Sequence, residues 1–117
     1  MLGLCIFAWV QSSYQAEVYK NSPEGRAEAA RQQDQFLIEL DQGFVQTRLR
    51  DPDSAQFMGS RVVRKGGEEG VCGYVNSRNG FGGMAGSEEF AVIGVEVLFA
   101  SEGREAYNRV DSFCDHR

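Results

Sequence analysis

The chain has 117 residues, which is the length of a single domain, and 42 % hydrophobic and 25 % charged residues are ordinary globular values that exclude wholesale disorder. Seventeen acidic against twelve basic side chains give a formal net charge of −5. Binding to phosphates needs clustered Lys and Arg, so this charge argues against a nonspecific DNA or RNA binder.

The first ten residues, MLGLCIFAWV, are apolar and uncharged. The run ends at Gln11, well short of the roughly 20 residues that a transmembrane helix needs, and it lacks the basic start of a secretory signal. Two interpretations stay open. Residues 1–10 are the remnant of an export signal or membrane anchor, which allows membrane association, or they pack on the core. We treat residues 1–21 as a lead and polar linker, and 22–117 as a single domain.

A long helix is predicted to begin at Ser22-Pro23-Glu24, where a capping hydroxyl, a first-turn proline and a first-turn acid follow one another. The helix ends at Asp51-Pro52, because a residue before proline is pushed out of the α region. Asp51 then caps one further turn over Pro52–Gln56. The expected core stripe of the helix recurs at three- and four-residue spacing and consists of Ala27, Ala30, Phe36, Leu37, Leu40, Phe44, Val45 and Leu49.

From Phe57 the pattern changes to that of strands. Phe57–Lys65 and Val71–Asn76 are predicted to form a hairpin around a glycine-rich turn at 66–70. The glycine-rich segment 77–87 is expected to be a loop. Glu89–Phe99 is the strongest strand signal, with Gly94 and Glu96 indicating a bulge or an exposed point midway.

The last element is a short helix, predicted to be capped by Ser101, with Tyr107, Val110 and either Phe113 or Cys114 on one side. Strands and helices are segregated along the chain, as in α+β proteins. The expected fold is a long N-terminal helix packed on a small antiparallel sheet of about three strands, with a short C-terminal helix.

Cys72 and Cys114 form a natural pair, one in a strand and one in the last helix. A disulfide between them closes a loop of about 40 residues and contributes on the order of 3 to 4 kcal/mol in the chain-entropy model. We expect this disulfide if the protein is exported. The alternative is two buried free thiols in a cytosolic protein.

Other chemistry finds little support in the sequence. Cys72, Cys114, Asp115 and His116 are metal-ligand types, but no CxxC or HxxxH spacing accompanies them. His116 is the only histidine, so a thiol nucleophile lacks a convincing base. The glycine-rich loop precedes a strand, whereas phosphate-binding loops precede a helix. We therefore expect no catalytic residues, no metal site and no cofactor.

A candidate binding loop follows the second predicted strand and consists of Asn76, Arg78, Asn79, Phe81, Gly82, Gly83 and Met84. The amide and guanidinium groups can recognise a ligand, or they can satisfy the backbone of a tight loop, and we favour the second role. Phe81 and Met84 can anchor a partner or fold back onto the sheet.

The segments LRDPDSAQF and VCGYVNSRNGFGGMAG, followed by a strand that begins at Phe90, resemble a recurring module in small bacterial and phage proteins of unknown function. Its pattern is approximately DPxSAxF, then VCGxVNxxNxxGG. Members commonly resemble envelope proteins, with an export signal or lipid anchor in front and a second cysteine near the C-terminus. The resemblance covers about Leu49 to Phe90, with Cys114 as a late match, and it implies no particular chemistry.

These features favour a non-enzymatic binding or accessory domain of the bacterial envelope, periplasmic or envelope-associated, whose partner is another protein. The alternative is a cytoplasmic, phage-encoded inhibitor that binds a host protein through an acidic surface.

Overall fold

The computed structural model describes residues 15–78 and 83–114 of the chain. The chain divides into two compact units, Met1–Gln33 and Asp34–Arg117, and helix α2, Pro23–Thr47, begins in the first and ends in the second. The apolar lead at residues 1–10 lies outside the described residues. Within the described ranges, no helix is long and apolar enough to cross a membrane.

In the first unit, residues 15–21 are helical and a bend at Ser22 separates them from α2. The Ser22 hydroxyl oxygen accepts a hydrogen bond from the Gly25 N–H at 3.1 Å and donates one to the Tyr19 carbonyl at 2.6 Å, so Ser22 caps α2 as predicted. A Cβ on Gly25 would lie 1.8 Å from the Tyr19 carbonyl oxygen. The bend therefore requires glycine at that position.

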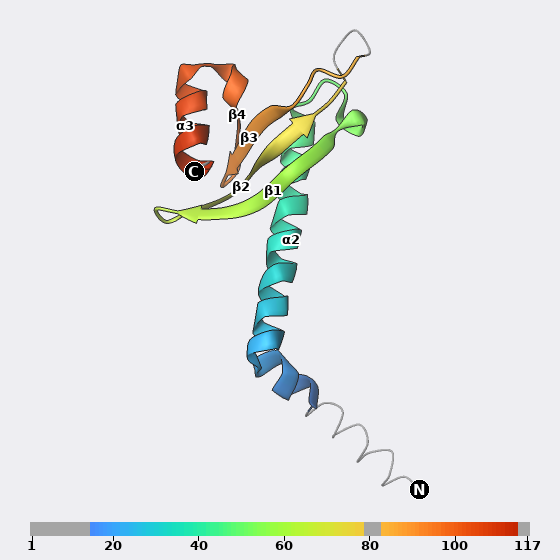
Figure 1. Cartoon of the computed structure of the whole chain (residues 1–117), viewed down its shortest axis with the longest axis vertical. Coiled ribbons are helices and arrows are strands. Elements are labelled where there is room, and N and C mark those ends of the chain that lie inside the picture. Colours follow the sequence, from blue (N-terminus) through green and yellow to red (C-terminus); the bar gives the residue numbers. More distant parts are fainter. Residues whose placement is uncertain (1–14, 79–82, 115–117) are drawn as a thin grey trace, which may run out of the picture. The chain divides into compact units, whose positions relative to one another are not determined.

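The second unit contains an antiparallel sheet of four strands in the order β1-β2-β3-β4 (Figure 1). The strands are β1 Gln56–Lys65, β2 Glu68–Asn76, β3 Glu88–Ile93 and β4 Glu96–Phe99. A short 3₁₀ turn, η1 Pro52–Ser54, connects α2 to the sheet. The α+β fold class is confirmed, and the strand count of about three is corrected to four.

The extra strand arises at Gly94, where the backbone has φ 63°. This left-handed conformation reverses the chain, so the segment predicted as one strand folds into β3 and β4, with Phe90 paired to Phe99. Both halves carry apolar residues, which hides the turn in the sequence. The first hairpin also turns more tightly than predicted, because Gly66 and Gly67 alone form the turn and 68–70 belong to β2.

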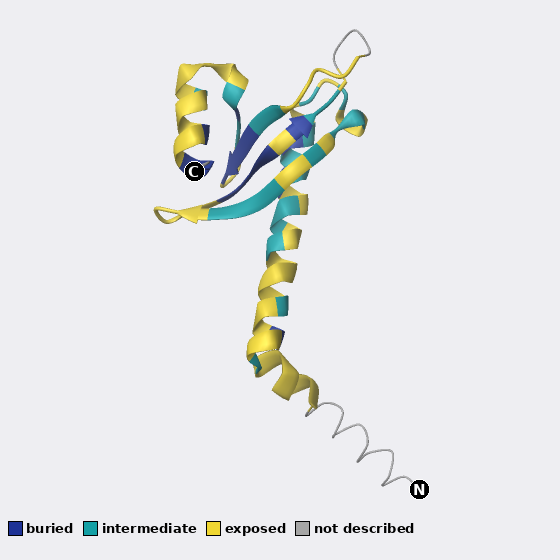
Figure 2. Cartoon of the chain, in the orientation of Figure 1, coloured by how far each residue is buried: buried dark blue, intermediate teal, exposed yellow. Residues whose placement is uncertain are grey.

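The sheet is covered on both faces, and its two central strands are the most buried (Figure 2). Side chains alternate along β2, so that Val71 and Val75 join Val45 of α2 in one cluster, while Cys72 joins α3, Arg104–Cys114, in another. The second cluster consists of Cys72, Ala91, Ile93, Val110, Phe113 and Cys114. Each helix thus has a core layer of its own.

The core stripe of α2 is rotated relative to the prediction. Phe36 is 69 % exposed and Leu40 46 % exposed, although both were expected to be buried. Packing on the sheet is supplied by Leu37, Ile38, Phe44 and Val45. Because residues three and four apart lie on one side of a helix, two overlapping stripes fit the sequence, and contact with the sheet selects the one that includes Ile38.

Helix α2 ends at Thr47, earlier than the predicted stop at Asp51. The N–H groups of Arg48 and Leu49 bond to the carbonyls of Val45 and Gln46, which tightens the last turn. Asp51 precedes η1, but its side chain makes no capping hydrogen bond there.

The C-terminal helix also starts differently. Ser101 lies in a separate 3₁₀ turn, η2 Ala100–Glu102, and its hydroxyl donates to the Glu88 carboxylate instead of capping α3. Gly103, with φ 137°, provides the break before α3. Val110 and Phe113 are buried as predicted, whereas Tyr107 is 52 % exposed.

Candidate functional site

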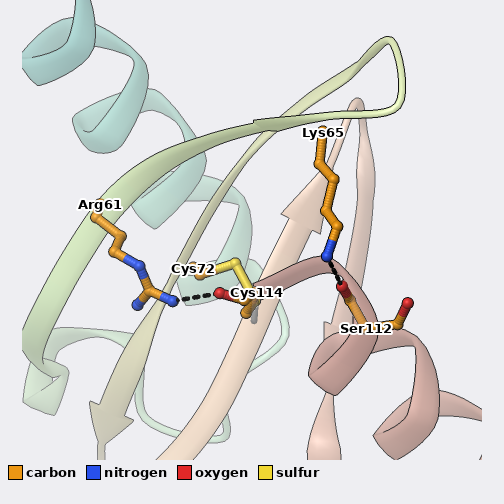
Figure 3. Close-up of a disulfide and its surroundings, with 5 residues drawn as sticks. All are labelled: Arg61, Lys65, Cys72, Ser112 and Cys114. Atoms are coloured by element: carbon orange, nitrogen blue, oxygen red, sulfur yellow. Dashed lines mark hydrogen bonds between the residues drawn. A yellow bond between two sulfur atoms is a disulfide. The ribbon is translucent and has the colours of Figure 1, made fainter. Parts of the chain in front are cut away.

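A disulfide joins Cys72 of β2 to Cys114 at the end of α3, with the two Cα atoms 5.9 Å apart (Figure 3). Two cations of β1 bind carbonyls at the same helix end. Arg61 Nη2 donates to the Cys114 carbonyl and Lys65 Nζ to the Ser112 carbonyl, both at 2.7 Å. Such donors satisfy the last carbonyls of a helix and complement its dipole. The end of α3 is therefore held to β2 by the disulfide and to β1 by two hydrogen bonds.

The two halves of the sequence module meet in space. Ser54 Oγ accepts a hydrogen bond from the Arg78 N–H at 2.7 Å, and Asp51 Oδ2 lies 3.6 Å from Arg78 Nη1. Asn76 Oδ1 accepts a bond from the Gly86 N–H at 3.0 Å. These contacts hold one end of the 77–87 loop against the η1 turn and the other end against the last residue of β2.

The apolar and glycine positions of the module also have packing roles. The rings of Phe57 and Phe90 meet edge to face, with centroids 5.8 Å apart. A Cβ on Gly73 would lie 3.0 Å from Ser60 Cα and 3.1 Å from Phe90 Cζ, so a larger residue there would require β1 or the Phe90 ring to shift by a few tenths of an ångström. The module is thus largely explained by the architecture of the sheet.

Three of the predicted binding residues, Asn79, Phe81 and Gly82, lie outside the described residues. The other four are described. Asn76 and Arg78 shape the loop, while Gly83 and Met84 are exposed. An isolated bridge between Arg78 and Met84, together with a 2.8 Å bond from the Ala85 N–H to the Ser77 carbonyl, closes the base of the loop.

Beside this loop base lies an open cleft of about 570 Å³. The walls are formed by the segment that follows α2, the loop base, the start of β3 and the β4–η2 junction. Its apolar lining residues are Leu49, Ala85 and Phe99, and its hydroxyl groups belong to Ser77 and Ser101. The charged lining residues are Arg48, Arg50, Arg78, Glu88 and Glu102.

The three arginines of the cleft differ in how they are held. Arg48 donates to the Val97 carbonyl at 3.2 Å and to Glu102 at 2.9 Å, and its guanidinium lies 5.5 Å from the centre of the Phe99 ring. Arg78 is paired with Asp51. Arg50 is exposed and makes no hydrogen bond or ion pair with another described residue. The cleft therefore presents one guanidinium that is available to a ligand.

A second cavity, of about 420 Å³, lies between α3, the β1–β2 turn and the end of β3. Its cations are already engaged, since Arg109 pairs with Glu68 at 3.2 Å and Lys65 binds the Ser112 carbonyl. Across residues 15–78 and 83–114, no group of three or more His, Cys, Asp and Glu side chains is placed to hold a metal ion. The cleft beside the loop is the better candidate for a binding site.

The loop could be named from the sequence, whereas the roles of Arg48, Arg50 and Phe99 in the cleft could not. The signal available for the arginines was their position in the last turn of the predicted helix, where cations commonly complement the dipole. Phe99 looked like an ordinary core residue. Only the fold brings these three positions to the side of the loop base.

A scan against protein-family models, a search of curated proteins and a search of solved structures each found no match to this chain. The interpretation of the cleft therefore depends on its geometry and charge.

Proposed function

We propose that this protein is a small, non-enzymatic binding or accessory domain of the bacterial envelope, and that the cleft beside the 77–87 loop is its contact surface for another protein. The observation that carries this proposal is the combination in one cleft of an available arginine, Arg50, with apolar surface from Leu49 and Ala85. Protein contact sites typically combine apolar area with a few placed polar groups.

The Cys72–Cys114 disulfide supports the assignment to the envelope. Disulfides persist in oxidising compartments and are rare in the cytosol, and the Cys72–Cys114 bridge is a buried part of the core. The resemblance of the sequence module to envelope proteins points in the same direction. A protein partner fits the net charge of −5 better than a nucleic acid does.

Site-specific photo-crosslinking in cells tests the contact surface. A photoreactive amino acid at Ala85, which is exposed at the cleft, should give a discrete adduct with one partner protein. The matched control is the same amino acid at Glu105, which is exposed on α3. The proposal fails if Ala85 gives no adduct, or if both positions give the same adducts.

The compartment has its own test. Protein recovered from the envelope fraction should take up two more alkyl groups after reduction than before it, as expected for a bridge between Cys72 and Cys114. The third cysteine, Cys5, lies outside this bridge and adds the same mass in both samples if it is retained. Recovery from the cytoplasm with both thiols free, together with an adduct to a host protein, would favour the alternative of an intracellular inhibitor.

A further inference from the structure

We infer that the cleft binds a peptide segment in which one carboxylate side chain stands next to an apolar side chain. In this arrangement the carboxylate pairs with Arg50, and the apolar side chain contacts Leu49 and Ala85. This inference rests on the proposed function of the same cleft and specifies the chemistry of the partner.

Arg50 defines the charged part of this ligand. Arg48 and Arg78 already have carboxylate partners in Glu102 and Asp51, so they mainly shape the wall. The Arg50 guanidinium keeps its donors for a ligand, since it bonds to no other described residue. A planar guanidinium binds a carboxylate through two parallel hydrogen bonds, which selects an acidic side chain over a neutral amide.

The rest of the cleft defines the neighbouring group. Leu49 is half-buried and Ala85 is exposed, so both leave apolar surface open to a ligand. Phe99 is largely buried beneath the Arg48 guanidinium and forms the floor. A volume of about 570 Å³ is within the usual range for ligand sites and accommodates two side chains of a peptide.

Charge complementarity favours a peptide over a polyanion. Among the described lining residues, Arg48 is paired with Glu102 and Arg78 with Asp51, so Arg50 is the arginine that has no carboxylate partner, on a protein whose net charge is −5. One carboxylate from a ligand matches the charge of Arg50. A nucleic acid strand or an anionic membrane would bring many negative charges against Glu88, Glu102 and the overall field of the protein.

The test is an NMR titration of the oxidised full chain with three capped hexapeptides of otherwise glycine and serine residues. Their central pairs are glutamate–leucine, glutamine–leucine and glutamate–glycine. We expect the glutamate–leucine peptide to shift the Arg50 side-chain and Ala85 backbone resonances in a saturable way. Each of the other two peptides should bind at least about tenfold more weakly. The glutamine–leucine peptide loses the charged hydrogen bonds to Arg50, and the glutamate–glycine peptide loses the apolar contact.

Two variants locate the effect. Arg50→Gln should weaken binding of the glutamate–leucine peptide about tenfold or more. Arg104→Gln, which changes an exposed arginine on α3 outside this cleft, should leave it unchanged. Both sites are on the surface, so thermal unfolding of both variants should match that of the parent chain.

The inference is overturned if the glutamine–leucine peptide binds equally well, if Arg50→Gln has no effect, or if no peptide shifts the cleft resonances. It is also overturned if an oligo-dT strand or a phosphatidylglycerol vesicle shifts those resonances more strongly than the peptide does. A specific adduct from Ala85 combined with any of these results would leave the proposed function standing with a different ligand chemistry. If Ala85 gives no adduct and no peptide binds, both the proposed function and this inference are contradicted.

Discussion

Asp41 is the one charged residue among the buried core side chains of the described structure, with an exposed fraction of 2 %. It lies on α2 one turn from Leu37 and one turn from Val45, both of which pack against the sheet. Burial, followed by the negative charge of Glu69 on β2, raises the pKa of Asp41 from 3.8 to about 6. At neutral pH this carboxylate is mainly ionised and destabilises the fold relative to a neutral side chain.

Replacement of Asp41 by Asn should therefore stabilise the protein at pH 8, by on the order of 1 to 3 kcal/mol. The pKa is higher in the folded state than in the unfolded state, so the folded state holds the proton longer as the pH rises. The stability of the parent chain should consequently fall between about pH 4 and pH 6 and then level off. Urea unfolding at several pH values measures both curves, which should converge near pH 4.

Asp111→Asn is the matched control, because Asp111 is an exposed carboxyl on α3. Its effect should stay within about 0.5 kcal/mol at every pH. A constant difference between the parent chain and Asp41→Asn from pH 4 to pH 8 would show that the benefit does not come from the buried charge.

At the scale of elements, the glycines of the sheet and of the helix have different roles. Gly73 is in β2, where a methyl group would press on Ser60 and on the Phe90 ring. Gly43 is in α2, and nothing lies within 4 Å of the position of its missing Cβ. The same substitution should thus act in opposite directions in the two elements.

Gly73→Ala should lower the free energy of unfolding by about 1 to 3 kcal/mol, as expected for overpacking of a filled core. Gly43→Ala should raise it by up to about 1 kcal/mol, because alanine is the better helix former and the space is open. Denaturant titration of the two variants beside the parent chain measures both. A stabilising Gly73→Ala would mean that β1 can move away from β2 without loss.

The elements were largely predictable from the sequence, because hydrophobic periodicity and turn residues are local signals. The cap at Ser22 and the hairpin of β1 and β2 illustrate this. The split between β3 and β4 was not resolved, because Gly94 reads equally well as a bulge or as a turn. The rotation of α2 depends on which stripe contacts the sheet, and this is a tertiary property.

The candidate site was less predictable. Asn76 and Arg78 were recognised because their polar groups stand together in one loop, and loop shaping was the favoured role. The cleft combines that loop with Arg50 and Phe99, which lie in two other segments of the chain. No local pattern indicates that these segments meet. The availability of the Arg50 guanidinium could be recognised only after the contacts of its neighbours were known.

At the scale of the whole molecule, the layer between α3 and the sheet is small and is closed by covalent and polar links. The apolar contribution of α3 to its core cluster comes from Val110, Phe113 and Cys114. A short amphipathic helix with so few buried residues is marginal without tertiary support. Its attachment therefore depends on the Cys72–Cys114 bridge and on the Arg61 and Lys65 hydrogen bonds.

The relative sizes of these links lead to a ranked prediction. The disulfide spans a sequence separation of 42 residues, and its loss in the double variant Cys72→Ala/Cys114→Ala should lower stability by about 3 to 4 kcal/mol. Arg61→Gln should lower it by about 1 to 2 kcal/mol, because one charged hydrogen bond is lost. Lys65→Gln should have a smaller effect, since Lys65 is exposed to solvent.

Hydrogen exchange separates a local effect from a global one. In the double cysteine variant, amides of α3 should exchange much faster than those of β2 and β3, because the helix can leave the sheet while the α2 layer holds. Reduction of the parent chain should reproduce this pattern, which excludes an artefact of the alanines. If the exchange of α3 and of the central strands rises equally, the disulfide stabilises the whole unit, and α3 is an integral part of the fold rather than a separately attached layer.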